Sequence, residues 1–250
     1  PSTLKKLDRY AFAGCTSLNE IKLPNTLIKL GQCVFYGCTS LKKIDLSQTG
    51  ITEIYPQTFM NSVLEEIELP SSLTNIGQQA FSDCTMLKKM DLSQTRITEI
   101  PTSTFYGCTA LKEVKLPNTV TKIEKSAFMR CSSMEKIDLS QTNVKEIQRD
   151  AFYGCEELVE LGLPKSLTKI EDNAFYFCKS LKKIDLSQIN LEQIGEYAFG
   201  YCSSLKKIDL SQTNVKEIGE GAFCNCSVAE ELDLPKILVQ IGEYAFSGCD

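Results

Sequence analysis

A phenylalanine returns at nearly constant intervals along the chain, and this periodicity constrains the fold more than any other feature. Successive members of the series are 22 to 24 residues apart. The series consists of Phe12, Phe35, Phe59, Phe81, Phe105, Phe128, Phe152, Phe175, Phe199, Phe223 and Phe246. A coil of about 23 residues cannot bury both of its faces alone, so neighbouring coils must stack and complete one another's core. The sequence therefore predicts a repeat solenoid.

Each coil also contains a short strand pattern. The segment SLKKIDLSQ at 180–188 returns letter for letter at 204–212. Within it, Leu181, Ile184 and Leu186 place apolar side chains at the spacing of a half-buried strand. We expect ten such strands between Leu18 and Leu234, stacked in parallel and one coil apart.

The coils are of two kinds. The longer ones leave the strand through Ser-Gln, and the shorter ones leave it through proline, which ends a strand abruptly because it donates no hydrogen bond. The two kinds alternate until the segment from Phe175 to Phe223, where two Ser-Gln coils follow each other. A duplicated coil explains this break in the alternation.

Length and charge fit one continuous array. The 250 residues hold about ten to eleven coils of 22–24 residues, so we expect a single domain over residues 1–250. The net charge is −5, and positive and negative residues are interspersed along the chain. The absence of a basic region argues against nucleic acid as a partner. No apolar run approaches the roughly 18 residues of a membrane helix. The chain begins at Pro1 inside a repeat and ends at Asp250 beside a repeat cysteine, so we expect a fragment of a longer protein.

Ten of the twelve cysteines lie three residues after the repeat phenylalanine. That spacing turns both side chains toward the core, where cysteine acts as a small apolar residue. The central members of these two structural columns are Phe128, Phe152, Phe175, Cys131, Cys155 and Cys178. Adjacent coils are within disulfide reach, but parallel inward side chains orient poorly for bridging, so we expect reduced thiols rather than a disulfide ladder.

Three positions depart from the cysteine column. Cys33 and Cys224 fall outside it, and we expect them to be exposed. The coil of Phe59 is one residue shorter than the others, with 60–63 filling the turn. We interpret this shorter coil as a deletion of the thiol position.

A column of hydroxyl residues lies eight residues after the first strand leucine, as Thr95, Thr119 and Thr142 illustrate. The resulting pattern L-x-x-I-x-L-x-x-(S/T) resembles a leucine-rich repeat. With the A-F-x-x-C turn and the proline exit, it resembles the BspA-like subclass of bacterial and protist surface proteins, over essentially all 250 residues.

This resemblance implies a leucine-rich-repeat arc with a parallel β-sheet on the concave side. The convex side would carry irregular, short 3-10 or helical turns and short strands. Three departures predict locally loose packing. Ile189 and Ile237 interrupt the hydroxyl column, and Ala229 stands where a strand leucine belongs.

The sequence contains few of the residues and motifs that catalysis requires. The chain contains no histidine, which removes the commonest general base and the commonest metal ligand. No phosphate-binding or dinucleotide-binding motif occurs, and the carboxylates recur at repeat positions instead of forming one distinctive pair. We therefore expect no catalytic residues, no cofactor, no metal and no enzymatic activity.

Two outward columns on the predicted strands carry charge. In the first column glutamate and lysine alternate from coil to coil, until Lys183 and Lys207 come to lie side by side. The alternation indicates an ion-pair ladder or a striped surface for a partner. The second column is mostly acidic and includes Asp185, Asp209 and Asp233 on successive coils. Three interpretations of these aspartates remain open. The neighbouring lysines screen their charge, or they form an acidic patch for a basic partner, or they form a weak calcium site.

A row of aromatic residues is the third candidate surface. Tyr106, Met129, Tyr153 and Tyr176 each follow the repeat phenylalanine of successive coils. Exposed tyrosine is a residue type that anchors protein partners, although single tyrosines also cover turns without further function.

These observations favour a non-catalytic, protein-binding module with an extended concave or lateral surface. The resemblance implies adhesion or recognition of a host or extracellular protein, at the cell surface or after secretion, without direct membrane insertion. An intracellular or structural scaffold with a reduced cysteine column is the alternative. An enzyme or ion-binding site on the acidic column is a third hypothesis.

Overall fold

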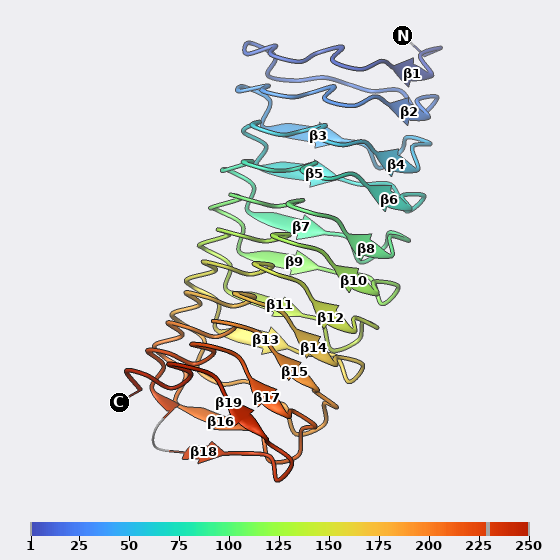
Figure 1. The fold of residues 1–250 in the computed structure, drawn as a ribbon. Helices are drawn as coiled ribbons and strands as arrows, with labels where there is room; N and C mark the ends of the chain where they lie inside the picture. Colours follow the sequence, from blue (N-terminus) through green and yellow to red (C-terminus); the bar gives the residue numbers. More distant parts are fainter. Residues whose placement is uncertain (1, 229–230, 250) are drawn as a thin grey trace.

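The computed structural model describes residues 2–228 and 231–249 as one continuous stack of coils (Figure 1). Most coils have three sides: a three-residue strand, a two-residue strand, and a turn that carries the repeat phenylalanine. All strand pairs are parallel and join neighbouring coils. The prediction of a solenoid is therefore confirmed.

The three-residue strands line one side of the stack, which we call the first sheet, and correspond to the strand pattern seen in the sequence. Its strands are β3 (Lys43–Asp45), β5 (Glu66–Glu68), β7 (Lys89–Asp91), β9 (Glu113–Lys115), β11 (Lys136–Asp138), β13 (Glu160–Gly162), β16 (Lys207–Asp209) and β18 (Glu231–Asp233). The strand pairing of this sheet is interrupted after β5 and after β13. The prediction of ten strands was wrong at two coils. Residues 18–23 form no strand, and Lys183 contributes only a bridge to Lys207. This second break lies where two like charges are cross-strand neighbours, an arrangement that is destabilising.

The two-residue strands line the adjoining side of the stack, which we call the second sheet (Figure 1). Its strands are β1 (Lys6–Leu7), β2 (Lys29–Leu30), β4 (Glu53–Ile54), β6 (Asn75–Ile76), β8 (Glu99–Ile100), β10 (Lys122–Ile123), β12 (Glu146–Ile147), β14 (Lys169–Ile170), β15 (Gln193–Ile194), β17 (Glu217–Ile218) and β19 (Gln240–Ile241). Their pairing is interrupted after β2 and after β6. The last seven of these, β8 to β19, pair in one uninterrupted sheet.

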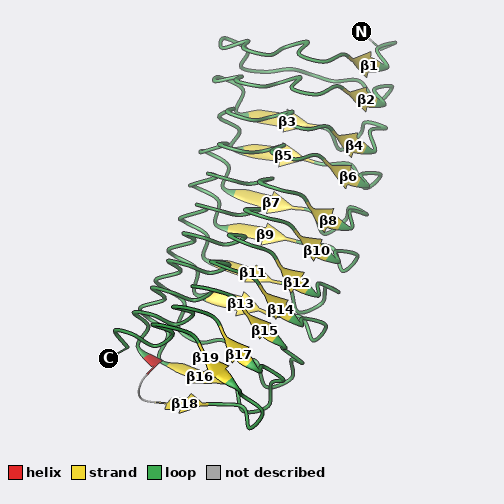
Figure 2. Cartoon of the chain, in the orientation of Figure 1, coloured by secondary structure: helices red, strands yellow, loops and turns green. Residues whose placement is uncertain are grey.

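The phenylalanine turns form the third side, and they too are joined by backbone hydrogen bonds. The N–H of Phe105 donates to the carbonyl oxygen of Ala127 in the next coil over 2.8 Å. The residues two before and two after each phenylalanine have positive φ, as Ser103 (φ 54°) and Gly107 (φ 69°) show beside Phe105. A left-handed residue on each side prevents a helix from continuing. The turns are therefore not helical, and Figure 2 shows strand and loop over nearly all of the described chain.

The repeat phenylalanines stack through the centre of the molecule. Neighbouring rings are 5.1 to 5.6 Å apart between centroids, with interplanar angles of 2° to 9°. The nine rings from Phe35 to Phe223 are fully buried. Each stacked pair contributes about 0.5–1.5 kcal/mol beyond its burial, so this column joins the coils along the whole array.

The column cysteines lie beside this stack and are free thiols. Eight of the ten are buried, while Cys15 and Cys249 are half-buried. From Cys38 onward each column thiol donates a hydrogen bond to the carbonyl oxygen of a phenylalanine in the preceding coil, at 3.0 to 3.3 Å.

The expectation that Cys33 and Cys224 are exposed was wrong. They are 2% and 5% exposed. The thiol of Cys33 lies 3.4 Å from the amide oxygen of Gln57 in the next coil. The thiol of Cys224 lies beside Gly200 of the preceding coil.

The short coil of Phe59 also differs from expectation. Ser62, not a deletion, occupies the thiol position. Its N–H donates to the carbonyl oxygen of Phe59 over 3.1 Å, and its hydroxyl lies 3.4 Å from the thiol of Cys84. The missing residue therefore falls between Ser62 and Leu64.

The hydroxyl column uses two acceptors that match the two kinds of coil. In Ser-Gln coils the hydroxyl bonds within its own coil, as Thr142 does to the carbonyl oxygen of Leu139 over 2.7 Å. In proline coils it bonds to the preceding coil, as Thr119 does to the carbonyl oxygen of Ile97 over 2.6 Å. Of the predicted departures, Ile189 is buried, Ile237 is exposed, and Ala229 lies outside the described residues.

Candidate functional site

Five aromatic side chains meet on the turn side of the array, and we call them the aromatic cluster: Tyr153, Tyr176, Phe177, Tyr197 and Tyr201. The ring of Phe177 stacks on that of Tyr201 at 4.7 Å between centroids, and the ring of Tyr176 meets Phe177 edge-on at 4.7 Å. Tyr201 is exposed and the other four are half-buried. The cluster is therefore a surface feature.

Three members of the aromatic cluster sit in left-handed backbone. Phe177, Tyr197 and Tyr201 have φ of 62°, 53° and 60°. Bulky residues rarely adopt this conformation, which costs roughly 1–2 kcal/mol per residue. Five other coils place glycine at the position of Phe177, and in three of them it lies within a Tyr-Gly-Cys motif, at 36–38, 106–108 and 153–155.

The sequence held a signal for this cluster that the periodic pattern did not use. Eleven of the twelve phenylalanines belong to the central column, and Phe177 is the remaining one. It replaces the glycine of the Tyr-Gly-Cys motif, and the next coil reverses the order to Gly200-Tyr201. Both changes fall within the duplicated coils.

Two glycines make room for the rings. A Cβ on Gly200 would lie 2.8 Å from the ring of Tyr176, and a Cβ on Gly221 would collide with the ring of Tyr197. Each ring thus leans over a glycine of the next coil. The close packing of Tyr176 also raises its pKa by desolvation.

The predicted tyrosine row is brought together only in part. Tyr153 and Tyr176 are in contact, at 5.3 Å between centroids. Tyr106 lies apart and pairs with Arg130, whose guanidinium is 6.0 Å from the ring centroid and donates to the tyrosine hydroxyl over 3.3 Å. Met129, between them in the row, is half-buried.

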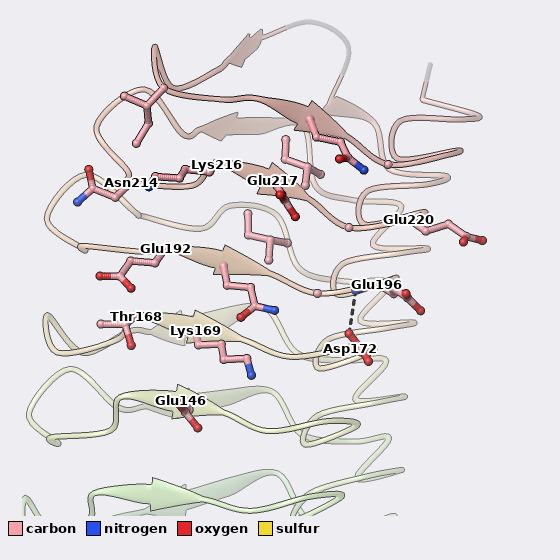
Figure 3. Close-up of a pocket in the computed structure, with 18 of the residues that line it drawn as sticks. Glu146, Thr168, Lys169, Asp172, Glu192, Glu196, Asn214, Lys216, Glu217 and Glu220 are labelled. Atoms are coloured by element: carbon pink, nitrogen blue, oxygen red, sulfur yellow. Dashed lines mark hydrogen bonds between the residues drawn. The ribbon is translucent and has the colours of Figure 1, made fainter.

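A hollow of about 1340 Å³ runs along the outer face of the second sheet, over the coils that carry the aromatic cluster (Figure 3). We call it the acidic groove. Its charged lining consists of seven carboxylates and two lysines, namely Glu146, Asp172, Glu192, Glu196, Glu217, Glu220, Glu243, Lys169 and Lys216. Sequence reasoning missed this surface because it weighed only the charges on the first sheet.

One edge of the acidic groove is a line of acidic residues at the corner after the second strand: Asp172, Glu196, Glu220 and Glu243. Figure 3 shows Glu196 and Glu220 extending from this corner on the same side. The carboxylate of Asp172 accepts a hydrogen bond from the N–H of Glu196 over 3.0 Å. Within the described residues, none of the four forms an ion pair with a lysine or arginine.

The acidic groove and the aromatic cluster meet at one hydrogen bond. The hydroxyl of Tyr197 donates to the carboxylate of Glu220 over 2.7 Å. This bond to a carboxylate raises the pKa of Tyr197 to about 12, so the tyrosine remains protonated. The two surfaces are therefore continuous.

The acidic column on the first sheet has a local structural role that the sequence did not indicate. The carboxylates of Asp185 and Asp209 accept the N–H of Ser187 and Ser211 over 3.0 and 2.9 Å, which closes the Ser-Gln turn. These hydrogen bonds lower the pKa of both aspartates. Asp233, in a proline coil, is the cross-strand partner of Asp209.

The predicted charge ladder is present on the first sheet. Lys43 pairs with Glu66 over 2.6 Å, and Lys136 pairs with Glu113 over 3.2 Å. The two break-point residues Lys183 and Lys207 are cross-strand neighbours, as their spacing indicated. Exposed ion pairs of this kind contribute about 0–1 kcal/mol each, so the ladder adds little to stability.

A smaller hollow of about 690 Å³ lies on the first sheet. It lies where Gly162 interrupts the acidic column, and the carboxylate of Asp138 leans over this glycine, where a Cβ would collide with it. Lys183 and Asp185 line its far side.

Within residues 2–228 and 231–249, no group of three or more histidine, cysteine, aspartate or glutamate side chains is arranged to hold a metal ion. No helix in this part of the chain is long and apolar enough to cross a bilayer.

The sequence matches a family model described as BspA type leucine rich repeat region (6 copies), over residues 5–135 and 121–250. A search among curated proteins found no match. Among solved structures, the leucine rich repeat protein of T. pallidum is 32% identical, with a TM-score of 0.51. The alignment covers 72% of this chain and 75% of that protein.

Two further solved structures share the fold. A leucine-rich repeat protein from Bacteroides ovatus is 23% identical with a TM-score of 0.53, and the alignment covers 98% of this chain and 80% of that one. A protein from Faecalibacterium prausnitzii described as a leucine rich cell surface protein is 23% identical with a TM-score of 0.52. Its alignment covers 98% of this chain and 75% of that protein. With the family model spanning nearly every coil, the chain belongs to the BspA-type leucine-rich repeat family.

Proposed function

We propose that this chain is a non-catalytic protein-binding module of the adhesion or recognition type, and that its partner contacts the turn side of the array at the aromatic cluster. Leucine-rich repeat arrays present long, rigid surfaces built from neighbouring coils. The partner would be a host or extracellular protein.

The aromatic cluster carries this proposal. Phe177, Tyr197 and Tyr201 occupy left-handed positions at a cost of about 1–2 kcal/mol each. The six ring contacts of the cluster return about 0.5–1.5 kcal/mol apiece. The gain and the cost are similar, so the cluster adds little to the stability of the array. Left-handed residues flank the repeat phenylalanine in every coil, but in the coils of Phe175 and Phe199 bulky aromatic side chains occupy three of the four such positions. Strained residues that do not serve stability are typical of functional surfaces.

The residue types of the cluster also suit this function. Tyrosine and phenylalanine are enriched where proteins bind one another, and tyrosine is prominent among the residues that dominate binding energy. The rings of Tyr176, Phe177 and Tyr201 are held against each other at fixed angles, so little side-chain entropy would be lost on binding.

The first-sheet residues that the sequence singled out form a second candidate contact surface. Lys183 and Lys207 lie side by side, with Asp185 and Asp209 two residues further along. The side chains of these aspartates serve turns, which weakens their case as a recognition surface. Asp233 adds an exposed carboxylate at the next coil.

The family resemblance supports a location at the cell surface or in the extracellular space. The alternative function is an intracellular scaffold with a reduced cysteine column. The buried free thiols are compatible with this scaffold and with the protein-binding module alike. The sequence of the full-length chain distinguishes the two locations, because a signal peptide or anchor in it would support the cell-surface one.

The test uses glycine, the residue that other coils have at the strained positions. The double variant Phe177→Gly, Tyr201→Gly relieves left-handed strain and removes two rings from the cluster. We expect its thermal unfolding to stay close to that of the parent. A protein captured from host-cell extract by the parent chain, then purified and titrated directly, should bind the double variant at least about tenfold more weakly.

The matched control is Tyr10→Ala, which removes an exposed tyrosine on the same side of the array but at a distant coil. It should leave the affinity for the purified partner unchanged. If the double variant binds the partner as tightly as the parent does, the aromatic cluster is not the contact surface.

A further inference from the structure

We propose that the aromatic cluster and the acidic groove together form one docking surface for an extended, positively charged peptide segment rich in arginine. This inference rests on the proposed function and names the chemical class of the partner. Three independent features of the described residues support it: the charge of the groove, the faces of the aromatic rings, and the cations that already contact such rings in this molecule.

The charge of the acidic groove is strongly one-sided. Seven carboxylates line it against two lysine amines. The corner line of Asp172, Glu196, Glu220 and Glu243 advances by one residue per coil, about 4.8 Å at a time. Four such residues span about 14 Å, which is the length of four to five residues of extended peptide. A cationic segment laid along the corner would meet a carboxylate at every coil.

The same corner is different in the N-terminal half of the array. The equivalent positions there are held by Arg9, Gln32, Pro56, Gln78 and Thr102. The acidic line therefore begins only at the coils that also carry the aromatic cluster. A feature of the repeat itself would recur in every coil, whereas this line begins at the coil of Phe175, which carries part of the cluster, and continues to the coil of Phe246.

The rings offer a second kind of contact to cations. Electron-rich ring faces attract lysine and arginine, and arginine also stacks flat on them. The molecule already shows this contact beside the cluster, where the amine of Lys179 lies 5.5 Å from the ring centroid of Phe177. Arg130 makes the same kind of contact with Tyr106 on the turn side. An arginine of a partner would find rings and carboxylates within one surface.

The hydrogen bond between Tyr197 and Glu220 joins the two parts. It fixes the carboxylate of Glu220 beside the ring of Tyr197, which is itself 6.0 Å from Tyr176. A guanidinium over these rings would lie within reach of a carboxylate that needs no rearrangement. Such preorganisation favours binding because less order must be imposed on association.

The experiment uses defined peptides. An octapeptide of alternating arginine and serine is titrated into the intact chain by calorimetry, beside the same peptide with lysine and with glutamate in place of arginine. The chain has no tryptophan, so tyrosine fluorescence gives an independent signal from the cluster. We expect the arginine peptide to bind, the lysine peptide to bind several-fold more weakly, and the glutamate peptide not to bind. Binding should weaken as salt rises, because the contacts are exposed charges.

Two variants locate the binding site. Glu196→Gln with Glu243→Gln removes two charges from the corner, and we expect affinity for the arginine peptide to fall about tenfold. The matched control is Glu53→Gln with Glu99→Gln, which removes two charges from β4 and β8 of the same sheet and should leave affinity unchanged. Phe177→Gly with Tyr201→Gly should weaken binding and remove the preference for arginine over lysine.

Each contrary outcome points elsewhere. Equal binding of the arginine and glutamate peptides, or equal loss in the corner and control variants, overturns the inference. So does binding of a neutral oligosaccharide that depends on Phe177, without a response to the arginine peptide. Self-association that is lost in the corner variant would instead assign a second copy of this chain to the groove.

The failure of this inference and the failure of the proposed function are distinguishable. If the purified protein partner depends on Phe177 and Tyr201 while the arginine peptide does not bind, the module function stands and the cationic class is wrong. If neither the partner nor the peptide responds to those two substitutions, both proposals fail.

Discussion

The thiol of Cys131 donates a hydrogen bond to the carbonyl oxygen of Phe105 in the preceding coil, over 3.1 Å. The same oxygen accepts the N–H of Cys108 within its own coil, over 3.2 Å. One carbonyl group therefore holds a turn closed and ties it to its neighbour. The cysteine column is thus a series of hydrogen-bond donors as well as a set of small apolar side chains.

The first prediction concerns this bond. Cys131→Ala removes a buried donor and leaves a small cavity, and we expect the free energy of unfolding to fall by about 1–2 kcal/mol. Urea denaturation followed by circular dichroism measures the loss. Cys249→Ala, whose thiol makes the same bond from a half-buried position, should cost less. Equal losses at both positions would show that burial does not matter here.

The second prediction concerns the central stack. Phe152 lies between Phe128 and Phe175 at 5.1 and 5.2 Å, and all three rings are fully buried. We expect Phe152→Ala to destabilise the array by about 3–5 kcal/mol. Phe12→Ala is the control, because this ring is only partly buried and stacks with Phe35 alone among the described residues. An unchanged melting curve for Phe152→Ala would contradict the packing described above.

The third prediction concerns left-handed backbone. Gly154 has φ +71°, and the atoms nearest to an added Cβ are 3.9 Å away, so alanine fits but is strained. We expect Gly154→Ala to cost about 1–2 kcal/mol from conformation alone. The reverse change, Ser103→Gly at φ 54°, should stabilise by up to about 1 kcal/mol. Thermal unfolding of both variants checks the two signs, and the same sign for both would refute the argument.

The fourth prediction concerns thiol reactivity. Burial raises the pKa of Cys38 to about 11 and that of Cys84 to about 12, so few reactive thiolates exist near neutral pH. We expect the native chain to react slowly with a disulfide reagent, beginning with the half-buried Cys15 and Cys249. All twelve thiols should react in denaturant. A total below twelve would indicate disulfides.

The fifth prediction concerns acid. Hydrogen bonds from Ser93 and Ser187 hold the pKa of Asp91 and Asp185 below the ordinary value. Their ionised form is the one that the fold stabilises, so the contribution is complete above the unfolded pKa of about 3.9 and is lost as pH falls through the lower folded pKa. Urea midpoints measured from neutral pH to about pH 2 should decline across that window.

The control for the acid series keeps the hydrogen bond and removes the charge. In Asp91→Asn with Asp185→Asn, the amide oxygen still accepts the serine N–H but no longer titrates. The decline with pH should be shallower than in the parent chain. An identical decline would mean that other carboxylates dominate the acid response.

The repeat spacing alone was sufficient to predict the solenoid, the strand pattern, the buried phenylalanine column and the buried cysteine column. These features are accessible from sequence because inward side chains recur at the same place in every coil. The charge ladder was predictable for the same reason, since parallel strands bring equivalent positions of adjacent coils together, as with Lys43 and Glu66.

The tertiary structure decided which outward residues meet and what they do. It brought Phe177 onto Tyr201, turned Cys33 inward, and gave Asp185 a role in closing a turn. These outcomes depend on the left-handed residues that set the direction of each turn, and on the small offset between successive coils. A periodic pattern reports which face of a coil a side chain occupies, but it carries no information on how far that side chain leans toward the next coil.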